Sequence, residues 1–249
     1  QELEVDVISD GVDVLIPGIM QHIERAGVHS GDSIAVYPPY NLSDIMLDKI
    51  IECSTQLALS LKTKGLINIQ FLVYHNELYV IEVNPRASRT IPYISKVTGV
   101  PMVELATKIM VGAKLKKLGF GTGLYKTSPY VAVKVPVFSF EKLNDVNSQL
   151  GPEMKSTGEV LGMGKTIEEA LFKGLVSAGF KLCHPSKQRE VGVYFTVNDQ
   201  DKFEILGLAK KFSDLGLRLY ATAGTADTIR TLGIDVTTVD RLSQSDAIM

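Results

Sequence analysis

The chain has 249 residues, of which 45% are hydrophobic and 22% are charged, and its 26 basic and 28 acidic side chains give a formal net charge of -2. This composition is typical of globular domains and excludes a wholly disordered chain, a collagen-like repeat and a disulfide scaffold. The near-neutral balance provides no bulk attraction to nucleic acid or to an anionic membrane, so any anion must be bound at local sites.

The two cysteines, Cys53 and Cys183, lie far apart and lack metal-ligand spacing. They are predicted to be packing residues in a reducing cytoplasm. No apolar run approaches the ~20 residues of a membrane span, and no secretory leader opens the sequence. We therefore expect a cytoplasmic protein with no nucleic-acid or membrane partner. The chain begins at Gln1 and ends at Met249, which we interpret as a fragment of a longer protein.

Residues 2–11 alternate acidic and apolar side chains and then reach Asp10-Gly11, which predicts a strand entering a hairpin. Residues 12–16 are a plausible partner strand, whereas residues 18–26 fit a strand or a helix by pattern alone. Residues 27–33 are small and turn-forming around His29, which predicts a loop that brings backbone close to a ligand.

Residues 41–64 predict an amphipathic helix with Ser43 as its N-cap and Gly65 as its stop signal. Its apolar positions are Met46, Ile50, Leu57 and Leu61. Residues 66–74 and 78–84 then predict two strands joined by the three-residue loop 75–77.

Further along the chain, proline and glycine punctuation separates the predicted elements. They are a helix over 101–117 that ends in three lysines, a loop over 119–129, a strand over 130–138, and a helix over 166–179 with a Thr166 and Glu169 capping box. The polar stretch 183–190 predicts a domain boundary. Beyond it come a strand over 191–197, a helix over 199–215, a strand over 217–221 and a helix over 225–232, an alternation that predicts a parallel α/β unit.

The predicted hairpin has one polar face, because successive strand residues point to opposite sides. That face carries Asn68, Gln70, Leu72, Val80, Glu82 and Asn84, and the apolar face carries Ile67, Ile69, Phe71, Val73, Tyr79, Ile81 and Val83. With a three-residue loop, Gln70 lies directly opposite Glu82. Side-chain oxygens gathered in this way suit a Mg²⁺ ion shared with phosphate. The alternative is an ordinary polar face that meets water.

Two arginines, Arg86 and Arg89, follow this strand at once, placed to reach phosphoryl oxygens beside the metal. Together with the segments EVNPRASR (82–89), NIQF (68–71) and AGVHSGDS (26–33), they resemble the ATP-grasp units of the carbamoyl-phosphate synthase large subunit. The segment GPEMKSTGE (151–159) resembles the stretch that follows the second of that subunit's two homologous halves. The resemblance covers essentially the whole chain.

The resemblance implies specific roles at the site. It implies that Gln70, Glu82 and Asn84 ligate Mg²⁺ or Mn²⁺ and that Arg86 and Arg89 steady the transferred phosphoryl group. It implies that ATP is bound by Glu2, Gly27, Val28, His29, Ser30, Gln70 and Glu82, with Glu2 on the ribose. The family also holds K⁺ near the nucleotide, and Glu24, the Val28 carbonyl and Ser33 are compatible with it. For His29 alone, a structural histidine is the ordinary alternative.

The implied fold class is α/β, an α+β ATP-grasp C-terminal lobe with an antiparallel sheet followed by a partial parallel α/β regulatory domain. The implied divisions are the ATP-grasp lobe over 1–115, the remainder of the synthetic unit over 116–188, and a partial methylglyoxal-synthase-like allosteric domain over 189–249. In this family the second half phosphorylates carbamate with ATP for pyrimidine and arginine biosynthesis. The family's partner is a glutamine amidotransferase small subunit. Because the lobe that grips the ATP phosphates precedes Glu2 in the family, we expect the fragment alone to be inactive and to bind ATP weakly.

The segment TAGT (222–225) joins a predicted strand to a helix and presents hydroxyl groups at the helix N-terminus. By itself Thr225 is most simply an N-cap. The resemblance implies that Lys202, Thr222, Thr225 and Arg241 bind a nucleotide effector, UMP or IMP.

One departure from the family concerns ornithine. Glu24 and Asp32 match acids that hold ornithine in activated members, but the third acid is replaced by Val135, which cannot pair with an ammonium group. Ornithine activation is therefore not expected. Two other functions remain as alternatives: a stand-alone nucleotide-binding regulatory module, and another ATP-grasp ligase such as a carboxylase.

Overall fold

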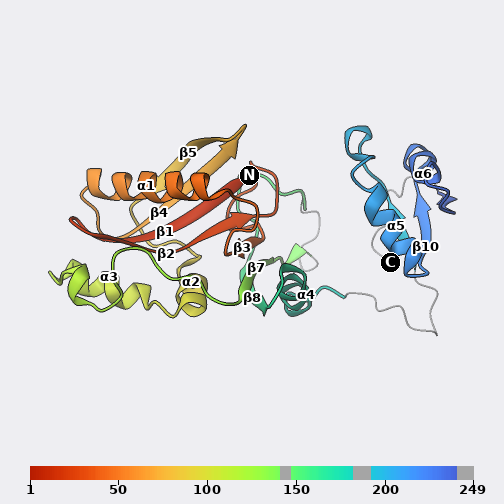
Figure 1. Ribbon diagram of the computed structural model, residues 1–249. Coiled ribbons are helices and arrows are strands. Elements are labelled where there is room, and N and C mark those ends of the chain that lie inside the picture. The colour runs from red at the N-terminus through yellow and green to blue at the C-terminus, as the bar shows by residue number, and fades with distance from the viewer. Residues whose placement is uncertain (141–146, 182–191, 240–249) are drawn as a thin grey trace. The chain divides into compact units, whose positions relative to one another are not determined.

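The computed structural model describes residues 1–140, 147–181 and 192–239, which belong to two compact units, Gln1–Phe180 and Lys181–Met249 (Figure 1). Each unit has its own hydrophobic core. Cys183, Arg241 and the expected boundary at residues 183–190 lie outside the described residues. The three-part division at 115 and 188 stays an expectation. None of the described helices is long and apolar enough to cross a membrane.

The first unit is built on an eight-stranded sheet with the order β5-β4-β1-β2-β3-β7-β8, and β6 pairs with β2. Its strands are β1 (Glu2–Asp10), β2 (Val14–His22), β3 (Ala35–Tyr37), β4 (Lys64–Tyr74), β5 (Glu77–Asn84), β6 (Gly123–Leu124), β7 (Val131–Val137) and β8 (Gly158–Gly164). The predicted first strand is confirmed, and residues 14–22, left partly open by the sequence, form a single strand. Strands β3 and β8 were not predicted, because β3 has three residues and β8 has glycine at both ends.

Helices cover both faces of this sheet (Figure 1). They are α1 (Asp44–Ser60) on one face, α2 (Ile91–Thr98) and α3 (Met102–Met110) on the other, and α4 (Ile167–Ser177) against β7 and β8. On the α1 side, Met46 and Ile50 pack on Leu3 and Phe71. The predicted N-cap is confirmed, since Ser43 Oγ accepts a hydrogen bond from Met46 N at 3.3 Å.

The residues after α1 correct one prediction. The helix ends at Ser60, well before Gly65, and the chain reverses at Lys62, which has a φ of 52°. Gly65 lies inside β4, where it pairs with Ser9 of β1. Gly65 is therefore not the stop signal. Leu61 is also 54% exposed instead of covering the core.

The prediction of one helix over 101–117 is also wrong. Helix α3 ends at Met110, and Gly112, with a φ of 105°, separates it from the short 3-10 helix η1 (Leu115–Lys117). The lysines therefore do not cap α3. Helix α2 was not predicted, since its eight residues begin beside Pro92 in a stretch interpreted only as the end of the hairpin.

Helix α4 confirms the prediction for residues 166–179 and lies unusually close to the sheet. A Cβ atom on Gly162 of β8 would clash with the Ala170 carbonyl oxygen, so only glycine permits this approach. Thr166 Oγ1 accepts from Glu169 N at 3.3 Å, as predicted. The Glu169 carboxylate accepts from Lys165 N at 2.7 Å, one residue before the expected partner.

The second unit contains a three-stranded parallel sheet with the order β11-β10-β9, which confirms the predicted parallel α/β arrangement. Its elements are β9 (Gly192–Phe195), η3 (Asp199–Asp201), α5 (Leu206–Asp214), β10 (Arg218–Ala221), α6 (Ala223–Arg230) and β11 (Thr237–Thr238). The single helix expected over 199–215 is instead η3 followed by α5. Helix α6 begins at Ala223, so the N-cap is Thr222 and not Thr225.

Candidate active site

Two rows of polar side chains cross strands β1, β4 and β5 on the sheet face opposite α1. The cross-strand register places Glu4, Gln70 and Glu82 in one row. It places Asp6, Asn68 and Asn84 in the next. Because directly paired residues share a face, all six side chains project to the same side. The two rows form the floor of the candidate site.

The predicted pairing of Gln70 with Glu82 is confirmed, but the geometry that produces it differs from the prediction. The hairpin loop has two residues, since Tyr74 pairs with Glu77, and His75 and Asn76 have φ values of 47° and 63°. A bulge then shifts the register between Gln70 and Phe71, with Ile81 as the extra residue. The shorter loop and the bulge compensate for each other.

The same bulge overturns part of the predicted apolar face of β5. Before the bulge, Leu78 pairs with Val73 and Val80 pairs with Phe71, so Leu78 and Val80 lie on the α1 side. Tyr79 is 46% exposed and Ile81 is 49% exposed. Beyond the bulge, Val83 pairs with Ile69 and packs on the core as predicted.

The outer members of the two rows are exposed or half-buried and are linked by hydrogen bonds. Asn84 Nδ2 donates to Glu82 Oε1 at 2.7 Å, and Gln70 Nε2 donates to Ser30 Oγ at 3.1 Å. Both amides use their nitrogens in these bonds, so their carbonyl oxygens are the atoms that a cation would take. One carboxylate and two amide oxygens fit a Mg²⁺ ion that shares its coordination with phosphate.

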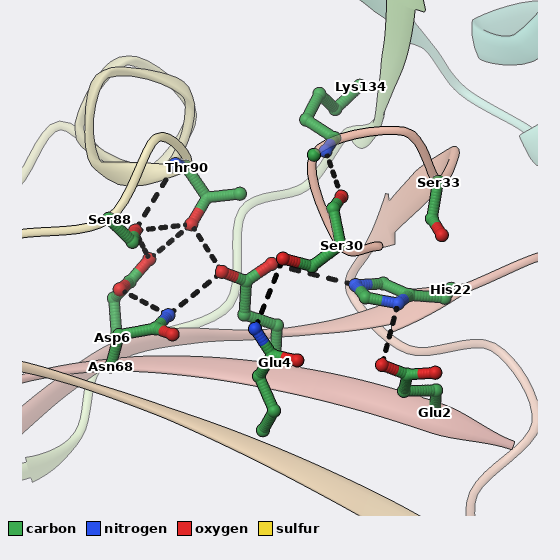
Figure 2. A network of polar contacts seen from close by, with 12 residues as sticks. Glu2, Glu4, Asp6, His22, Ser30, Ser33, Asn68, Ser88, Thr90 and Lys134 are labelled. Atoms are coloured by element: carbon green, nitrogen blue, oxygen red, sulfur yellow. Dashed lines mark hydrogen bonds and ion pairs between the residues drawn. The ribbon is translucent and has the colours of Figure 1, made fainter. Parts of the chain in front are cut away.

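The inner members, Glu4, Asp6 and Asn68, are buried (Figure 2). Asn68 Nδ2 donates both of its hydrogens, to Glu4 Oε1 at 2.8 Å and to Asp6 Oδ1 at 2.9 Å. Burial raises the pKa of Asp6 to about 7, and the Glu4 carboxylate acts in the same direction. Burial also acts to raise the pKa of Glu4, but His22 and Lys134 outweigh it and hold that pKa below its ordinary value.

His22 lies between two acids at the start of β1. Its Nδ1 is 3.8 Å from Glu2 Oε1 and its Nε2 is 3.5 Å from Glu4 Oε2. These separations are long for hydrogen bonds, yet His22 acts to lower the pKa of both carboxylates, against the effect of burial. Burial raises the pKa of Glu2 despite this opposing field.

The loop after β5 carries Arg86 and Arg89 at the edge of the rows, and both are exposed. Asp6 Oδ2 accepts hydrogen bonds from Ser88 Oγ at 2.9 Å and from Thr90 Oγ1 at 2.5 Å. These two bonds tie the arginine loop to the centre of the sheet (Figure 2).

The loop over residues 27–33 lies on the other side of the rows and, besides its bond to Gln70, is attached to two further segments. Lys134 Nζ, on a side chain only 1% exposed, donates to Ser30 O at 2.8 Å. Asp32 accepts from the backbone nitrogens of Lys155 and Ser156, each at 2.8 Å. The loop is thereby held to β7 and to the segment that precedes β8.

A cavity of about 250 Å³ lies between the two loops. Its lining residues are Glu4, His29, Ser30, Gly31, Asn68, Gln70, Glu82, Arg86, Ser88, Arg89, Thr90, Lys134 and Met154. The lining combines guanidinium and ammonium groups with carboxylate and amide oxygens. Such a cavity can hold a phosphorylated ligand with a bound cation.

Comparisons with known proteins assign both units. Residues 1–118 match the model of the carbamoyl-phosphate synthase L chain ATP binding domain, and residues 204–249 match the MGS-like domain. A carbamoyl phosphate synthase large chain of Clostridium botulinum is 55% identical over 98% of this chain. Those of Clostridium beijerinckii and Lachnoclostridium phytofermentans are 53% and 52% identical over 99% and 97% of it.

The chain belongs to the carbamoyl-phosphate synthase large-chain family. It spans 22% to 23% of the length of these three relatives. Among solved structures, K. lactis urea amidolyase superposes on 69% of this chain and 12% of its own, with a TM-score of 0.55 and 17% identity. A single-chain long-chain acyl-CoA carboxylase superposes on 69% of this chain and 22% of its own, with a TM-score of 0.53 and 18% identity. These two likenesses concern the fold alone.

The structure gathers most of the predicted site residues of this chain around one cavity. His29, Ser30, Gln70, Glu82, Arg86 and Arg89 line it. Asn84 adjoins it through its bond to Glu82. Glu2 lies beside Gly27, whose backbone N–H donates to its carboxylate. Gly27, Val28 and Glu2 are not among the lining residues, so they lie at most at its margin.

The residues proposed for potassium and ornithine are already engaged within the protein. Glu24 Oε2 accepts from Ile34 N at 2.7 Å, and Ser33 Oγ donates to His29 O at 3.4 Å. Val135 is 1% exposed and packs in the core with Ala170 of α4.

In the MGS-like unit, Lys202, Thr222 and Thr225 meet at the start of α6. Thr222 Oγ1 donates to Thr225 Oγ1 at 3.2 Å. A Cβ atom on Gly224 would lie 2.5 Å from Lys202 Nζ, so the ammonium group stands over the first turn of the helix. Lys202 also pairs with Asp199 at 2.5 Å.

The sequence prediction missed the buried part of the candidate site in the first unit. Glu4, Asp6, His22, Ser88, Thr90 and Lys134 were not singled out. A signal existed for some of them: the acids of residues 2–6 alternate with apolar residues on one strand, and Lys134 stands alone in the apolar run VAVKVPV. A lone charge in a buried strand is rarely tolerated without a partner.

Proposed function

We propose that this chain supplies the metal- and phosphate-binding lobe of the synthase unit that phosphorylates carbamate. The reaction converts carbamate and MgATP into carbamoyl phosphate and ADP. The observation that carries the proposal is the placement of three proposed metal ligands, Gln70, Glu82 and Asn84, beside Arg86 and Arg89 at one cavity. The relatives that share 52% to 55% identity with the chain are named carbamoyl phosphate synthase large chains.

In the proposed mechanism, a carbamate oxygen attacks the γ-phosphorus of ATP while the bond to the bridging oxygen of ADP breaks. No protein nucleophile is required, so the chain contributes orientation and charge. Glu82 and the carbonyl oxygens of Gln70 and Asn84 would hold Mg²⁺ or Mn²⁺, which would supply positive charge beside the ATP phosphates. Arg86 and Arg89 balance the charge on the phosphoryl group during transfer and on the acyl phosphate that results.

The loop over 27–33 is the proposed nucleotide-binding strip. Gly27, Val28, His29 and Ser30 would line the nucleotide, and Glu2 would accept from the ribose hydroxyls. Two contacts of Ser30 support this proposal. Gln70, a proposed metal ligand, donates to Ser30 Oγ, and Lys134 holds the Ser30 carbonyl oxygen. Glu24, the Val28 carbonyl and Ser33 are the proposed K⁺ ligands.

We propose that the MGS-like unit binds a nucleotide effector, UMP or IMP, at the start of α6. The Lys202 ammonium group over the first turn of the helix supports it, since both attract phosphate. The further parts of the proposal come from the family: a glutamine amidotransferase small subunit as partner, roles in pyrimidine and arginine biosynthesis, and a cytoplasmic location.

The test is the substitution Glu82→Ala in the full-length synthase. The variant should lose synthesis of ATP from carbamoyl phosphate and ADP, because the only carboxylate among the three proposed metal ligands is removed. Glu77→Ala is the matched control, since Glu77 is an exposed glutamate on the same strand that bonds only Tyr79 OH in the described structure. Retention of ATP synthesis by the Glu82 variant would refute the assignment.

A further inference from the structure

The loop that carries Arg86 and Arg89 has no regular structure of its own, yet the proposed phosphoryl transfer requires both guanidinium groups in place. Both arginines are exposed, and within the described residues the guanidinium of Arg86 has one hydrogen bond, from Nη1 to the neighbouring Ala87 O at 3.1 Å. Their positions therefore depend on the path of the backbone between β5 and α2.

We propose that Asp6, a residue of β1, is a positioning residue that fixes this path and so aims the arginines at the cavity. The inference rests on the proposed function for its kinetic consequence, but the contacts themselves are independent of it. Asp6 Oδ2 accepts from Ser88 Oγ at 2.9 Å and from Thr90 Oγ1 at 2.5 Å, the two residues that flank Arg89.

The orientation of the Asp6 carboxylate is set from the opposite side. Its Oδ1 accepts from Asn68 Nδ2 at 2.9 Å, and the same amide nitrogen donates to Glu4 Oε1 at 2.8 Å. Each Asp6 oxygen thus has a separate task, one toward the sheet and one toward the arginine loop. An asparagine at position 6 carries no charge and has one acceptor atom instead of two. Ser88 and Thr90 would therefore have to accept from its amide nitrogen and would lose their bonds to a carboxylate.

Thr90 provides a second, independent observation. It occupies the N-cap of α2, where a threonine hydroxyl ordinarily accepts a hydrogen bond from the helix backbone. Here no such cap bond forms. The hydroxyl instead contacts Asp6, Ser88 Oγ at 2.7 Å and Glu4 Oε1 at 3.2 Å. A cap bond worth about 1 kcal/mol to the helix is replaced by a tether between β1 and the loop.

Both ends of the tether, Asp6 and Thr90, are buried from water. Asp6 is 0% exposed and Thr90 is 2% exposed, so water cannot replace a bond that is lost. Asp10, on the same strand, shows what a purely structural aspartate does: it is 3% exposed and accepts from the backbone of Val12, Asp13 and Leu115. Asp10 touches no residue of the arginine loop in the described structure.

The experiment compares Asp6→Asn with Asp10→Asn in the full-length synthase, using ATP synthesis from carbamoyl phosphate and ADP. Asp6→Asn should raise the KM for carbamoyl phosphate about tenfold, while the KM for ADP changes less than about twofold, because only the phosphoryl contacts move. Thr90→Val is the milder variant should Asp6→Asn fail to fold, and it should show the same split. Equal effects on both KM values, or the same split in Asp10→Asn, would overturn the proposal.

A second measurement separates this proposal from the proposed function. Hydrogen–deuterium exchange over residues 85–90 should become about tenfold faster in Asp6→Asn or Thr90→Val, and should be unchanged in Asp10→Asn. Unchanged exchange in both would reject the tether whatever the enzyme does. Absence of ATP synthesis in the unmodified synthase would reject the proposed function, and the exchange data would still decide the tether.

Adding Asp6→Asn to Arg89→Ala tests whether Asp6 acts through the arginine. If it does, the double variant should lose less than about threefold more activity than Arg89→Ala alone. A loss that multiplies the two single effects would mean that Asp6 acts on the reaction by another route.

Discussion

The two halves of the site differ in where their polar groups face. Glu82, Asn84, Arg86 and Arg89 are exposed or half-buried at the edge of the sheet, whereas Glu4, Asp6 and Asn68 lie within it and are nearly inaccessible. An exposed group can exchange water for a ligand at little cost. A buried group must keep its protein partners, because leaving one unpaired costs about 1–3 kcal/mol. The outer set is therefore suited to binding a ligand, and the inner set to holding the outer set in place.

The largest effect should come from the outer set. Arg89→Ala in the full-length synthase is expected to lower kcat/KM for carbamoyl phosphate about 10³-fold, because a guanidinium that balances charge during transfer is removed. Its thermal unfolding should change little, since Arg89 is exposed. Steady-state kinetics on this variant and on Lys49→Ala, an exposed cation on α1, would check it. Equal losses of activity in the two variants would contradict the role of Arg89 in binding the phosphoryl group.

The inner set should show the opposite pattern. Asn68→Leu removes the amide that donates to both Glu4 and Asp6 and leaves two buried carboxyl groups short of a donor. The free energy of unfolding of the unit over residues 1–180 should fall by about 3 kcal/mol. Urea denaturation followed by circular dichroism measures it, and Gln56→Leu on the surface of α1 is the control. A change below about 1 kcal/mol would show that the network carries little stability.

The pH dependence of stability offers a sharper test of the inner set. Because the pKa of Asp6 is raised to about 7 in the folded state, this group retains its proton where the unfolded chain has lost it. Its contribution therefore makes the folded state less stable as pH rises from about 4 to about 7, by at most about 1.4 kcal/mol per pH unit. Asp6→Asn should remove that part of the slope. Parallel curves for the two proteins in urea would contradict the assignment of a buried, proton-retaining Asp6.

The isolated 249-residue chain should bind MgATP weakly, because the cavity of about 250 Å³ is small for a nucleotide. Isothermal titration is expected to show a dissociation constant of about 1 mM or higher. A micromolar value would mean that the described lobe is sufficient for the nucleotide.

The outer set could be predicted from the sequence because each residue carries a local signal. Glu82 and Asn84 are two apart on a strand, and Arg86 and Arg89 follow within a turn. The inner set depends on strand order: Asp6 meets Ser88 only because β4 lies between β1 and β5, and no local pattern reveals that order. Lys134 reaches Ser30 across 104 positions of sequence for the same reason.

Even the confirmed pairing of Gln70 with Glu82 came from two compensating errors, in the loop length and in the bulge. Periodicity determines which residues share a face only while the ladder is regular. The short elements α2 and β3 escaped prediction because eight and three residues are too few for a period to show.

The bulge at Ile81 also bears on how the hairpin can change its length. If Ile81 were deleted, the pairing of β5 with β4 would become regular, and Glu82 would still pair with Gln70. The hairpin therefore tolerates the loss of one residue between its turn and the pair of Gln70 with Glu82. Every site residue would keep its own face of the sheet after that loss.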